Sequence, residues 1–339
     1  MEKERYAKQI NFRGIGIEGQ ELLKGARVLI IGCGALGTVV ANSLARTGVG
    51  FLRIVDRDFV ELSNLHRQVL FNEADALNSV PKAEAAKESL IRVNSNIEIE
   101  AVIKDVNSIT IEGLADGVDI ILDCTDNFKT RYLINDIAFK KGIPWIYGGA
   151  VGSTGVIKGY IPGKTGCLRC LMEVPPPTGS IATCDTAGVI NMITGIVGLY
   201  QSSEAIKYLT RNYDLMDKNM LFIDLWDNVI ESVEVGQKDN CPCCQKGQYM
   251  YLDDKLPEAV HICGSNSVQV DPGSSKQLQL KQLYERLLVA DIKVRLTPFI
   301  LNISADGYEI KVFDDGRAII KNAKTVEEGK VVYAKYIGY

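Results

Sequence analysis

The chain has 339 residues, of which 46% are hydrophobic and 24% charged, so it is long enough for about two ordinary globular domains. Its net charge of −4 gives no electrostatic reason to expect binding to nucleic acid or to an anionic membrane surface. Residues 1–9 are too charged for a signal peptide. The nine cysteines then indicate reduced thiols, metal ligands or catalysis in a cytoplasmic protein rather than a disulfide framework.

Strands and helices alternate along the first half of the chain, and this pattern predicts an α/β fold with a Rossmann-like, mostly parallel sheet and helices on both faces. Polar helical segments over residues 5–24 precede the first strand. The strands are expected at residues 28–31, 51–55, 97–103, 118–122 and 144–147. One apolar helix follows the first strand, and further helices are expected at 81–94, 110–114 and 127–141.

The pattern changes after Gly148. A strand at 155–161 is predicted to be antiparallel, and a proline-rich loop, 171–184, precedes a helix over 187–210. Most of this helix lies in an uncharged run, 186–203. The polar residues and glycines of that run favour a buried helix over a membrane span. The remaining strands of this part are expected near residues 220–225 and 229–235.

A separate small α+β module is expected from about Tyr249. It should contain a strand near 260–263, a helix over 278–289 and three strand-like runs. Asp306-Gly307 and Asp315-Gly316 lie between those runs, where D-G is a strong hairpin signal. The module has no convincing catalytic group, so docking, regulation and a structural role stay open. The predicted domains are residues 1–248 and 249–339.

A glycine-rich turn follows the first strand. Gly32, Gly34 and Gly37 have the G-x-G-x-x-G spacing, which lets the backbone approach a phosphate while the next helix presents free N–H groups. Asp56 ends the second strand, where an acid can bind ribose hydroxyls. These residues predict a nucleotide site, and by themselves they fit NAD.

The polar stretch after the second strand favours ATP over a dinucleotide. Arg67 and Lys82 would place two cations at the nucleotide crevice, and Asn64 and Gln68 would add uncharged donors. Asp126, after the strand at 118–122, could hold Mg²⁺. Solvated surface charge remains the alternative for the two cations.

Several motifs together resemble those of the E1-like adenylating enzymes of the ThiF/MoeB/HesA type: RYAKQINF, SNLHRQ, PKAEAA, DCTDNFKTR, TCDTAGV and two CxxC pairs, over roughly residues 4–245. Enzymes of that family activate ubiquitin-like sulfur carriers in thiamine and molybdenum-cofactor synthesis. The resemblance implies a site for ATP and Mg²⁺, with Asp126 at the magnesium ion. Its residues would be Lys8, Gly32, Gly34, Asp56, Ser63, Asn64, Arg67, Gln68, Lys82, Asp126 and Asn127.

The resemblance also implies the reaction and the partners. The C-terminal Gly-Gly carboxylate of a carrier would attack the α-phosphate of ATP, giving an acyl-adenylate and pyrophosphate, with Arg67 and Lys82 stabilising the phosphate charge. A sulfur donor such as a cysteine desulfurase would supply the sulfur, and the enzyme would be a homodimer with part of helix 187–210 at its interface. The thiamine-thiazole branch is favoured, and activation of the molybdopterin synthase small subunit is the alternative. An NAD-dependent dehydrogenase and a non-catalytic carrier-binding scaffold are more distant alternatives.

The opening motif departs from the family at one position. Lys8 stands where the family usually has a second arginine that reaches the phosphates of the other subunit. Lysine keeps the charge but lacks the planar fork of a guanidinium. Arg13 is a candidate substitute for that arginine.

Two cysteine pairs have metal-ligand spacing. Cys167-x-x-Cys170 and Cys241-x-x-Cys244 predict a closed zinc site with four cysteine ligands, which would be structural because no ligand position is open. Coincidental core cysteines are the alternative. Cys243 intervenes in the second pair, but the two-residue spacing selects Cys241 and Cys244.

Cys184 is the candidate nucleophile. It follows the proline-rich loop and precedes the predicted helix over 187–210, whose N-terminus would favour a thiolate. The family's active-site cysteine falls in the same T-C-x-x-A-G-V context, so the resemblance implies a covalent or persulfide-exchange step with the activated carrier. A small buried residue that caps the helix is the alternative. Core positions are expected for Cys33, Cys124 and Cys263.

Overall fold

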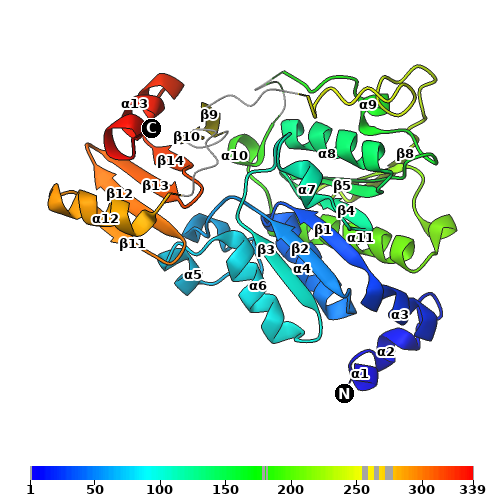
Figure 1. Cartoon of the computed structure of the whole chain (residues 1–339). Coiled ribbons are helices and arrows are strands. Elements are labelled where there is room, and N and C mark those ends of the chain that lie inside the picture. Colours follow the sequence, from blue (N-terminus) through cyan, green and yellow to red (C-terminus); the bar gives the residue numbers. More distant parts are fainter. Residues whose placement is uncertain are drawn as a thin grey trace. The chain divides into compact units, whose positions relative to one another are not determined.

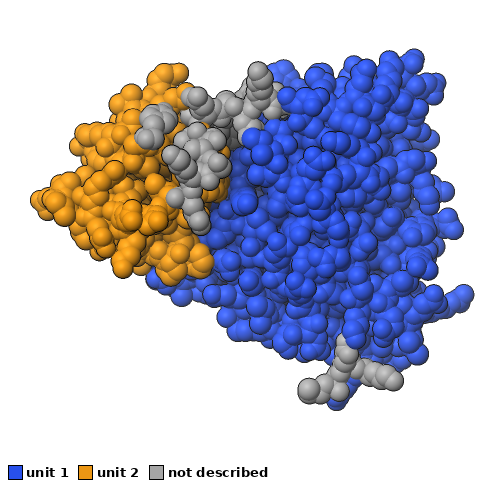
Figure 2. All heavy atoms as spheres, viewed as in Figure 1, with its two compact units in different colours: residues 1–254 blue, residues 255–339 orange. Residues whose placement is uncertain are grey.

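The structure is a computed structural model, and it describes residues 2–177, 180, 182–253, 259–262, 267–271 and 278–338. The chain forms two compact units, unit 1 from Met1 to Asp254 and unit 2 from Lys255 to Tyr339 (Figure 2). Unit 1 extends past residue 248 because Tyr251 and Leu252 pack against one of its hydrophobic cores.

Unit 1 is built on one eight-stranded sheet (Figure 1). Its strands are β1 (Arg27–Ile31), β2 (Phe51–Val55), β3 (Glu98–Val102), β4 (Ile120–Asp123), β5 (Trp145–Val151), β6 (Thr154–Tyr160), β7 (Met220–Asp224) and β8 (Val229–Val233). They lie in the order β3-β2-β1-β4-β5-β6-β7-β8. The first five strands pair in parallel and the last three continue the sheet antiparallel, which confirms the predicted α/β class.

Helices cover both faces of this sheet. They are α1 (Glu2–Arg5), α2 (Ala7–Ile10), α3 (Gly16–Gly25), α4 (Ala35–Thr47), the 3-10 helix η1 (Leu62–Asn64), α5 (Glu73–Leu77), α6 (Lys82–Val93), α7 (Ile111–Leu114), α8 (Phe128–Lys141), α9 (Leu168–Leu171), α10 (Cys184–Ala187), α11 (Asn191–Leu209) and the 3-10 helix η2 (Tyr213–Leu215). In β1, Val28 and Ile30 share a core with residues of α4, α6 and α11. Leu29 and Ile31 pack on the other face with residues of α7 and α8. The strand is apolar at every inner position because both of its faces are covered.

The helix predicted over 187–210 is interrupted at its start. Gly188 has φ 73° and ψ −178°, a conformation that favours glycine, and it ends the four-residue α10. The long helix α11 therefore begins at Asn191 rather than at residue 187. Ile193 and Val197 bury one side of α11, as expected for a helix that packs on the sheet. Among the described residues, no helix is long and apolar enough to span a bilayer.

Unit 2 contains a six-stranded antiparallel sheet and two helices. Its strands are β9 (Ala259–Ile262), β10 (Ser267–Val270), β11 (Lys293–Leu296), β12 (Ile300–Ala305), β13 (Tyr308–Phe313) and β14 (Ala318–Lys321), in the order β11-β12-β13-β14-β10-β9. Asp306 and Gly307, at φ 51° and 80°, form the predicted hairpin turn between β12 and β13. The helices are α12 (Leu280–Val289) and α13 (Val326–Tyr336), and α13 is an addition to the expected elements. Cys263 lies outside the described residues.

Candidate active site

The glycine-rich turn lies at the carboxyl end of β1. Gly32 has φ +90°, and a Cβ there would lie 2.7 Å from the carbonyl oxygen of Cys124. A Cβ on Gly37 would lie 2.0 Å from the carbonyl oxygen of Gly32, so both positions need glycine. Asp56 follows β2, and its Oδ2 accepts a 2.6 Å hydrogen bond from the backbone N–H of Cys33. The structure thus brings the acid and the turn together, and it buries Cys33 and Cys124 as predicted.

Lys82 begins α6 and is buried beside two acids. Only 8% of this residue is exposed, and its Nζ lies 3.3 Å from Oδ2 of Asp58. Burial by itself would lower the pKa of Lys82, but the charges of Asp58 and Asp56 raise it and keep the ammonium form. Burial also raises the pKa of Asp56, an effect that the charge of Lys82 opposes. Lys82 is therefore no solvated surface lysine, and Asp58 is a partner that sequence reasoning missed.

The SNLHRQ segment contributes one residue directly to the glycine turn. Gln68 is 3% exposed, and a Cβ on Gly34 would lie 3.8 Å from its Nε2. The buried Oε1 of Gln68 accepts no hydrogen bond from the described residues. Arg67 is half-buried, and its Nη1 donates to the carbonyl oxygen of Ser63 at 3.1 Å. Ser63 is exposed, and the side chain of Asn64 accepts a hydrogen bond from the backbone at the start of η1.

The carboxyl end of β4 carries the predicted magnesium ligand. Asp126 is exposed there, and Asn127 caps α8 by accepting a 2.9 Å hydrogen bond from the backbone N–H of Thr130. Because β4 pairs with β1 in parallel, both residues lie at the same edge of the sheet as the glycine turn. The geometry gives Asn127 a helix-capping contact, and its contact with a nucleotide stays a prediction.

Arg131 is a buried cation that sequence reasoning did not single out. Its side chain is 8% exposed, and its Nε lies 3.4 Å from Oδ2 of the fully buried Asp123. Its Nη2 donates to the carbonyl oxygens of Thr125 at 2.8 Å and Gly148 at 3.2 Å. Arg131 therefore ties the end of β4 to β5. The sequence held one indication of this role: Arg131 is four residues after the helix cap Asn127, and residues four apart lie on the same side of a helix.

Cys184 lies beside the end of β5. It is the first residue of α10 and is half-buried, and its Sγ donates to the carbonyl oxygen of Ala150 at 3.2 Å. The prediction that Cys184 stands at the N-terminus of the long helix is wrong, because Gly188 separates α10 from α11. The dipole of the long helix α11 therefore does not act at the Cys184 thiol. The structure instead places the Cys184 thiol near the end of β5, the strand whose Gly148 carbonyl oxygen accepts a hydrogen bond from Arg131.

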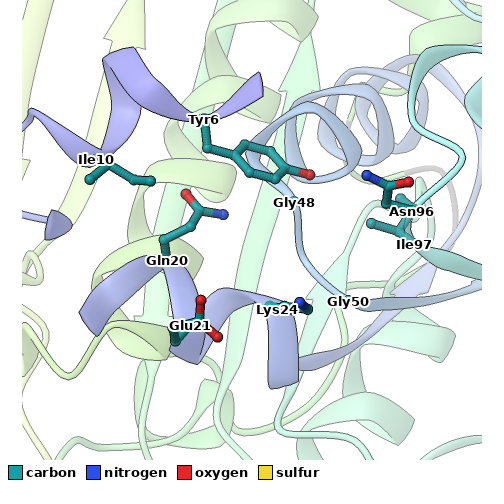
Figure 3. Close-up of a pocket in the computed structure, with 9 residues that line it drawn as sticks. All are labelled: Tyr6, Ile10, Gln20, Glu21, Lys24, Gly48, Gly50, Asn96 and Ile97. Carbon is teal, nitrogen blue, oxygen red and sulfur yellow. The ribbon is translucent and has the colours of Figure 1, made fainter. Parts of the chain in front are cut away.

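The N-terminal helices lie at the opposite edge of the sheet. A small pocket of about 120 Å³ opens there (Figure 3). It is lined by Tyr6, Ile10, Gln20, Glu21, Lys24, Gly48, Gly50, Asn96 and Ile97. Because Lys24 precedes β1 and Gly50 precedes β2, this pocket is at the amino ends of the strands and is not the nucleotide site. Lys8 and Arg13 are exposed in the same N-terminal segment.

The two CxxC pairs gather their sulfur atoms at one point. The Sγ atoms of Cys167, Cys170, Cys241 and Cys244 all lie within 4.8 Å of one another. Those of Cys167 and Cys241 are 3.4 Å apart, as are those of Cys170 and Cys244. A zinc ion about 2.3 Å from four tetrahedral sulfurs separates them by about 3.8 Å, so the arrangement fits zinc. Cys243 is buried nearby but is not in this set, as the spacing predicted.

Comparisons with known proteins agree with this arrangement. The chain is 39% identical over 337 residues to the sulfur carrier protein ThiS adenylyltransferase of Bacillus subtilis (strain 168), covering 98% of this chain and 99% of that protein. It is 36% identical over 251 residues to the SAMP-activating enzyme E1 of Haloferax volcanii, covering 74% of this chain and 92% of that protein. The solved structure of E. coli MccB with ATP is similar, with a TM-score of 0.63, 25% identity and coverage of 71% of this chain and 74% of that one. Since residues 6–243 also match the ThiF family model, this chain belongs to the ThiF family.

Proposed function

We propose that this protein adenylates the C-terminal Gly-Gly carboxylate of a ubiquitin-like sulfur carrier, consuming ATP and releasing pyrophosphate. The product would lead to the carrier thiocarboxylate used in thiamine-thiazole synthesis. The observation that carries the proposal is the 39% identity to a ThiS adenylyltransferase, which extends over 98% of this chain and 99% of that relative. A match of that extent includes unit 2 as well as the family domain.

ATP is proposed to bind at the carboxyl edge of the parallel strands. The backbone at Gly32 and Gly34 would approach the phosphates, and Asp56 would bind the ribose hydroxyls. Arg67 and Lys82 would stabilise charge on the phosphates as the carrier carboxylate attacks. The unsatisfied buried Oε1 of Gln68 supports a polar ligand beside the glycine turn.

The turn between β4 and α8 is proposed to serve the same reaction. Asp126 would bind Mg²⁺, which when bound neutralises phosphate charge. Arg131 would act as a positioning residue, because it donates both to the carbonyl oxygen of Thr125, inside this turn, and to that of Gly148, in the neighbouring strand β5.

The four-cysteine cluster, formed by Cys167, Cys170, Cys241 and Cys244, is proposed to bind a structural Zn²⁺. All four ligand positions would be filled by sulfur, which leaves no open position for a substrate. The ion would join the segment after β6 to the segment after β8, two parts of unit 1 that are distant in sequence. A cysteine desulfurase is the proposed source of the sulfur that the carrier receives.

A homodimer is proposed from the exposed side of α11. Met192, Leu199 and Tyr200 are 64%, 55% and 41% exposed, a strip of apolar side chains on a helix whose other side is buried. Lys8 and Arg13 lie in the N-terminal segment, whose Tyr6 and Ile10 line the pocket at the amino ends of the strands, and the glycine turn lies at the carboxyl ends. Either cation would therefore reach a nucleotide only in the other subunit.

The proposal is tested by pyrophosphate exchange into ATP with purified carriers. We expect exchange that depends on a ThiS-type carrier ending in Gly-Gly and that is lost when the two glycines are removed. Faster exchange with the molybdopterin synthase small subunit would move the assignment to that pathway. Absence of exchange with every carrier, together with tight NAD binding, would replace it with a dehydrogenase.

Cys184 is proposed to act on the activated carrier. Attack of its sulfur on the acyl carbon would form a thioester and release AMP, with the thiol proton passing to solvent. Mass spectrometry after turnover should then find a carrier–enzyme adduct that hydroxylamine or an exchanging thiol such as dithiothreitol removes and that Cys184→Ser does not form. An adduct of unchanged yield in Cys184→Ser would remove the covalent role.

A further inference from the structure

Asn135 connects the two CxxC segments through one side chain. It lies in the middle of α8 and is 0% exposed. Its Oδ1 accepts a 2.9 Å hydrogen bond from the backbone N–H of Leu168, which lies inside the first CxxC. Its Nδ2 donates to Sγ of Cys243 at 3.3 Å, inside the second CxxC. We propose that Asn135 is the positioning residue of the four-cysteine cluster, holding the two ligand pairs in register from α8. The inference rests on the proposed zinc site.

The two contacts require an amide. Leu168 begins α9, and the first N–H groups of a helix have no acceptor within it, so the oxygen of Asn135 satisfies one of them. The opposite end of the side chain must donate to sulfur. Asparagine offers an acceptor and a donor in one plane, whereas aspartate only accepts and leucine does neither. Asparagine is a poor helix former, so its place inside α8 is explained by these tertiary contacts.

The next residue of α8 fixes the chain that follows the second CxxC. Asp136 is 0% exposed, and its Oδ2 accepts a 3.0 Å hydrogen bond from the backbone N–H of Tyr251. Its Oδ1 lies 3.4 Å from Nδ2 of Asn135. The acid therefore gives the amide nitrogen a second acceptor and restricts its rotation. The pair of residues ties three separate segments to one helix.

Zinc retention is the property that this arrangement should control. The second pair of ligands comes from a segment more than 70 residues after the first, and Cys243 is 108 residues from Asn135. Outer-shell partners of metal ligands typically contribute about 10–100-fold to metal affinity. Loss of the amide should therefore raise the rate of zinc release by about that factor, because the two ligand pairs would separate more readily.

Asn94 provides a matched control. It is also 0% exposed, and its Nδ2 donates to Oη of Tyr6 at 2.8 Å and to the carbonyl oxygen of Ala45 at 2.7 Å. These contacts join the N-terminal segment to α4 rather than to the cysteines. Asn94→Leu and Asn135→Leu therefore remove comparable buried amides, and only the second touches the four-cysteine cluster.

The experiment uses the full-length protein with its zinc content measured. Zinc release to a chelating dye and the charge-transfer spectrum of the Co²⁺-substituted protein are compared for the wild type, Asn135→Leu and Asn94→Leu. We expect about 10–100-fold faster release and an altered Co²⁺ spectrum in Asn135→Leu only. Equal release rates in the two variants, with zinc bound in the wild type, would overturn the inference while leaving the zinc site intact. A wild type without zinc would overturn both.

Cys243→Ala keeps the test decisive if Asn135→Leu does not fold. It removes the sulfur acceptor while preserving the four ligands and the contact with Leu168. We expect it to release zinc faster than the wild type but more slowly than Asn135→Leu. Adding Cys243→Ala to Asn135→Leu should have no further effect, because the shared contact is already lost. If Cys243→Ala released zinc at the wild-type rate, the hydrogen bond from Asn135 to the Cys243 sulfur would have no part in zinc retention.

Discussion

Two buried cations, Lys82 and Arg131, form ion pairs with buried or partly buried acids at the carboxyl edge of the sheet. Lys82 lies beside Asp58 and Asp56, and Arg131 lies beside Asp123. In each group burial disfavours the charged forms while the opposite charges favour them. Removing one partner of a buried ion pair leaves an uncompensated charge away from water. Substitution of either cation should therefore reduce the free energy of unfolding much more than substitution of an exposed charge does.

Lys82→Ala is expected to lower carrier-dependent pyrophosphate exchange by about 10²–10³-fold, because it removes a cation proposed to stabilise phosphate charge. Lys87→Ala, one and a half turns further along α6, is the control for charge removal on the same helix. Thermal unfolding measured beside the exchange rate separates lost catalysis from lost fold. An unchanged exchange rate in a folded Lys82→Ala protein would show that the phosphate contacts are misassigned.

Arg131→Met is expected to make stability depend on pH. It leaves Asp123 buried without its cation, a loss that costs about 3–5 kcal/mol at neutral pH. Burial raises the pKa of Asp123 and Arg131 opposes this, so removing Arg131 raises that pKa further. The protonated carboxyl tolerates burial, so the deficit is full above the pKa of Asp123 in the folded variant and shrinks as pH falls through it.

Urea unfolding of the wild type and Arg131→Met from about pH 7 to about pH 5 measures this deficit. Adding Asp123→Asn should remove the pH dependence of the deficit, since no buried charge then remains without a partner. A deficit that stays constant across the range would contradict the assignment to Asp123.

At the scale of secondary-structure elements, α8 connects the two parts of the candidate site. Asn127 caps its start, Arg131 follows one turn later, and Asn135 another turn later contacts both CxxC segments. This spacing of four residues keeps the three side chains near one face of the helix. One helix, α8, therefore contacts both the carboxyl edge of the sheet, where ATP is proposed to bind, and the four-cysteine cluster.

The exposed side of α11 yields a prediction about assembly. Leu199→Asp should shift a homodimer towards monomer, because it places a charge in the apolar strip formed by Met192, Leu199 and Tyr200. Light scattering after size-exclusion chromatography measures the mass directly. Val289→Asp in α12, at a residue that is 91% exposed, controls for adding one charge elsewhere. A monomeric wild type, or a Leu199→Asp dimer of unchanged affinity, would speak against this interface.

At the scale of the whole molecule, the two units have separate cores. One core of unit 2 is formed only from residues between Val268 and Ile337, and the large cores of unit 1 end at Leu252. Tyr251 packs against Tyr132 with ring centres 4.9 Å apart, and its backbone N–H donates to Asp136. The chain up to residue 254 therefore carries every contact that these cores of unit 1 require.

Truncation after Asp254 is accordingly expected to leave a protein that unfolds cooperatively and keeps carrier-dependent exchange. Truncation after Gln248 also removes the partly buried Tyr251 and Leu252 and should lower the free energy of unfolding by about 2–3 kcal/mol more, the order of burying one large apolar side chain. Denaturant unfolding of both truncated proteins checks the difference. Equal stability would place the end of unit 1 at residue 248, and loss of exchange in both would assign unit 2 a part in activation.

The local patterns of the sequence were sufficient for the parallel sheet, the glycine turn, the cysteine spacing and the family. Each depends on residues within one strand, turn or knuckle, so the information lies in a short segment. The prediction failed at Gly188, where one backbone angle decides whether a helix continues, and apolarity alone does not report that angle.

Only the tertiary structure decided which distant residues meet. Asp58 beside Lys82, Arg131 between Thr125 and Gly148, and Asn135 between two CxxC segments are contacts of this kind. The polar type of each residue is visible in the sequence, but the partner depends on how the strands are ordered and which side of a helix faces the sheet. Burial then turns these contacts from exchangeable surface pairs into fixed ones, since a polar group removed from water must keep its partner.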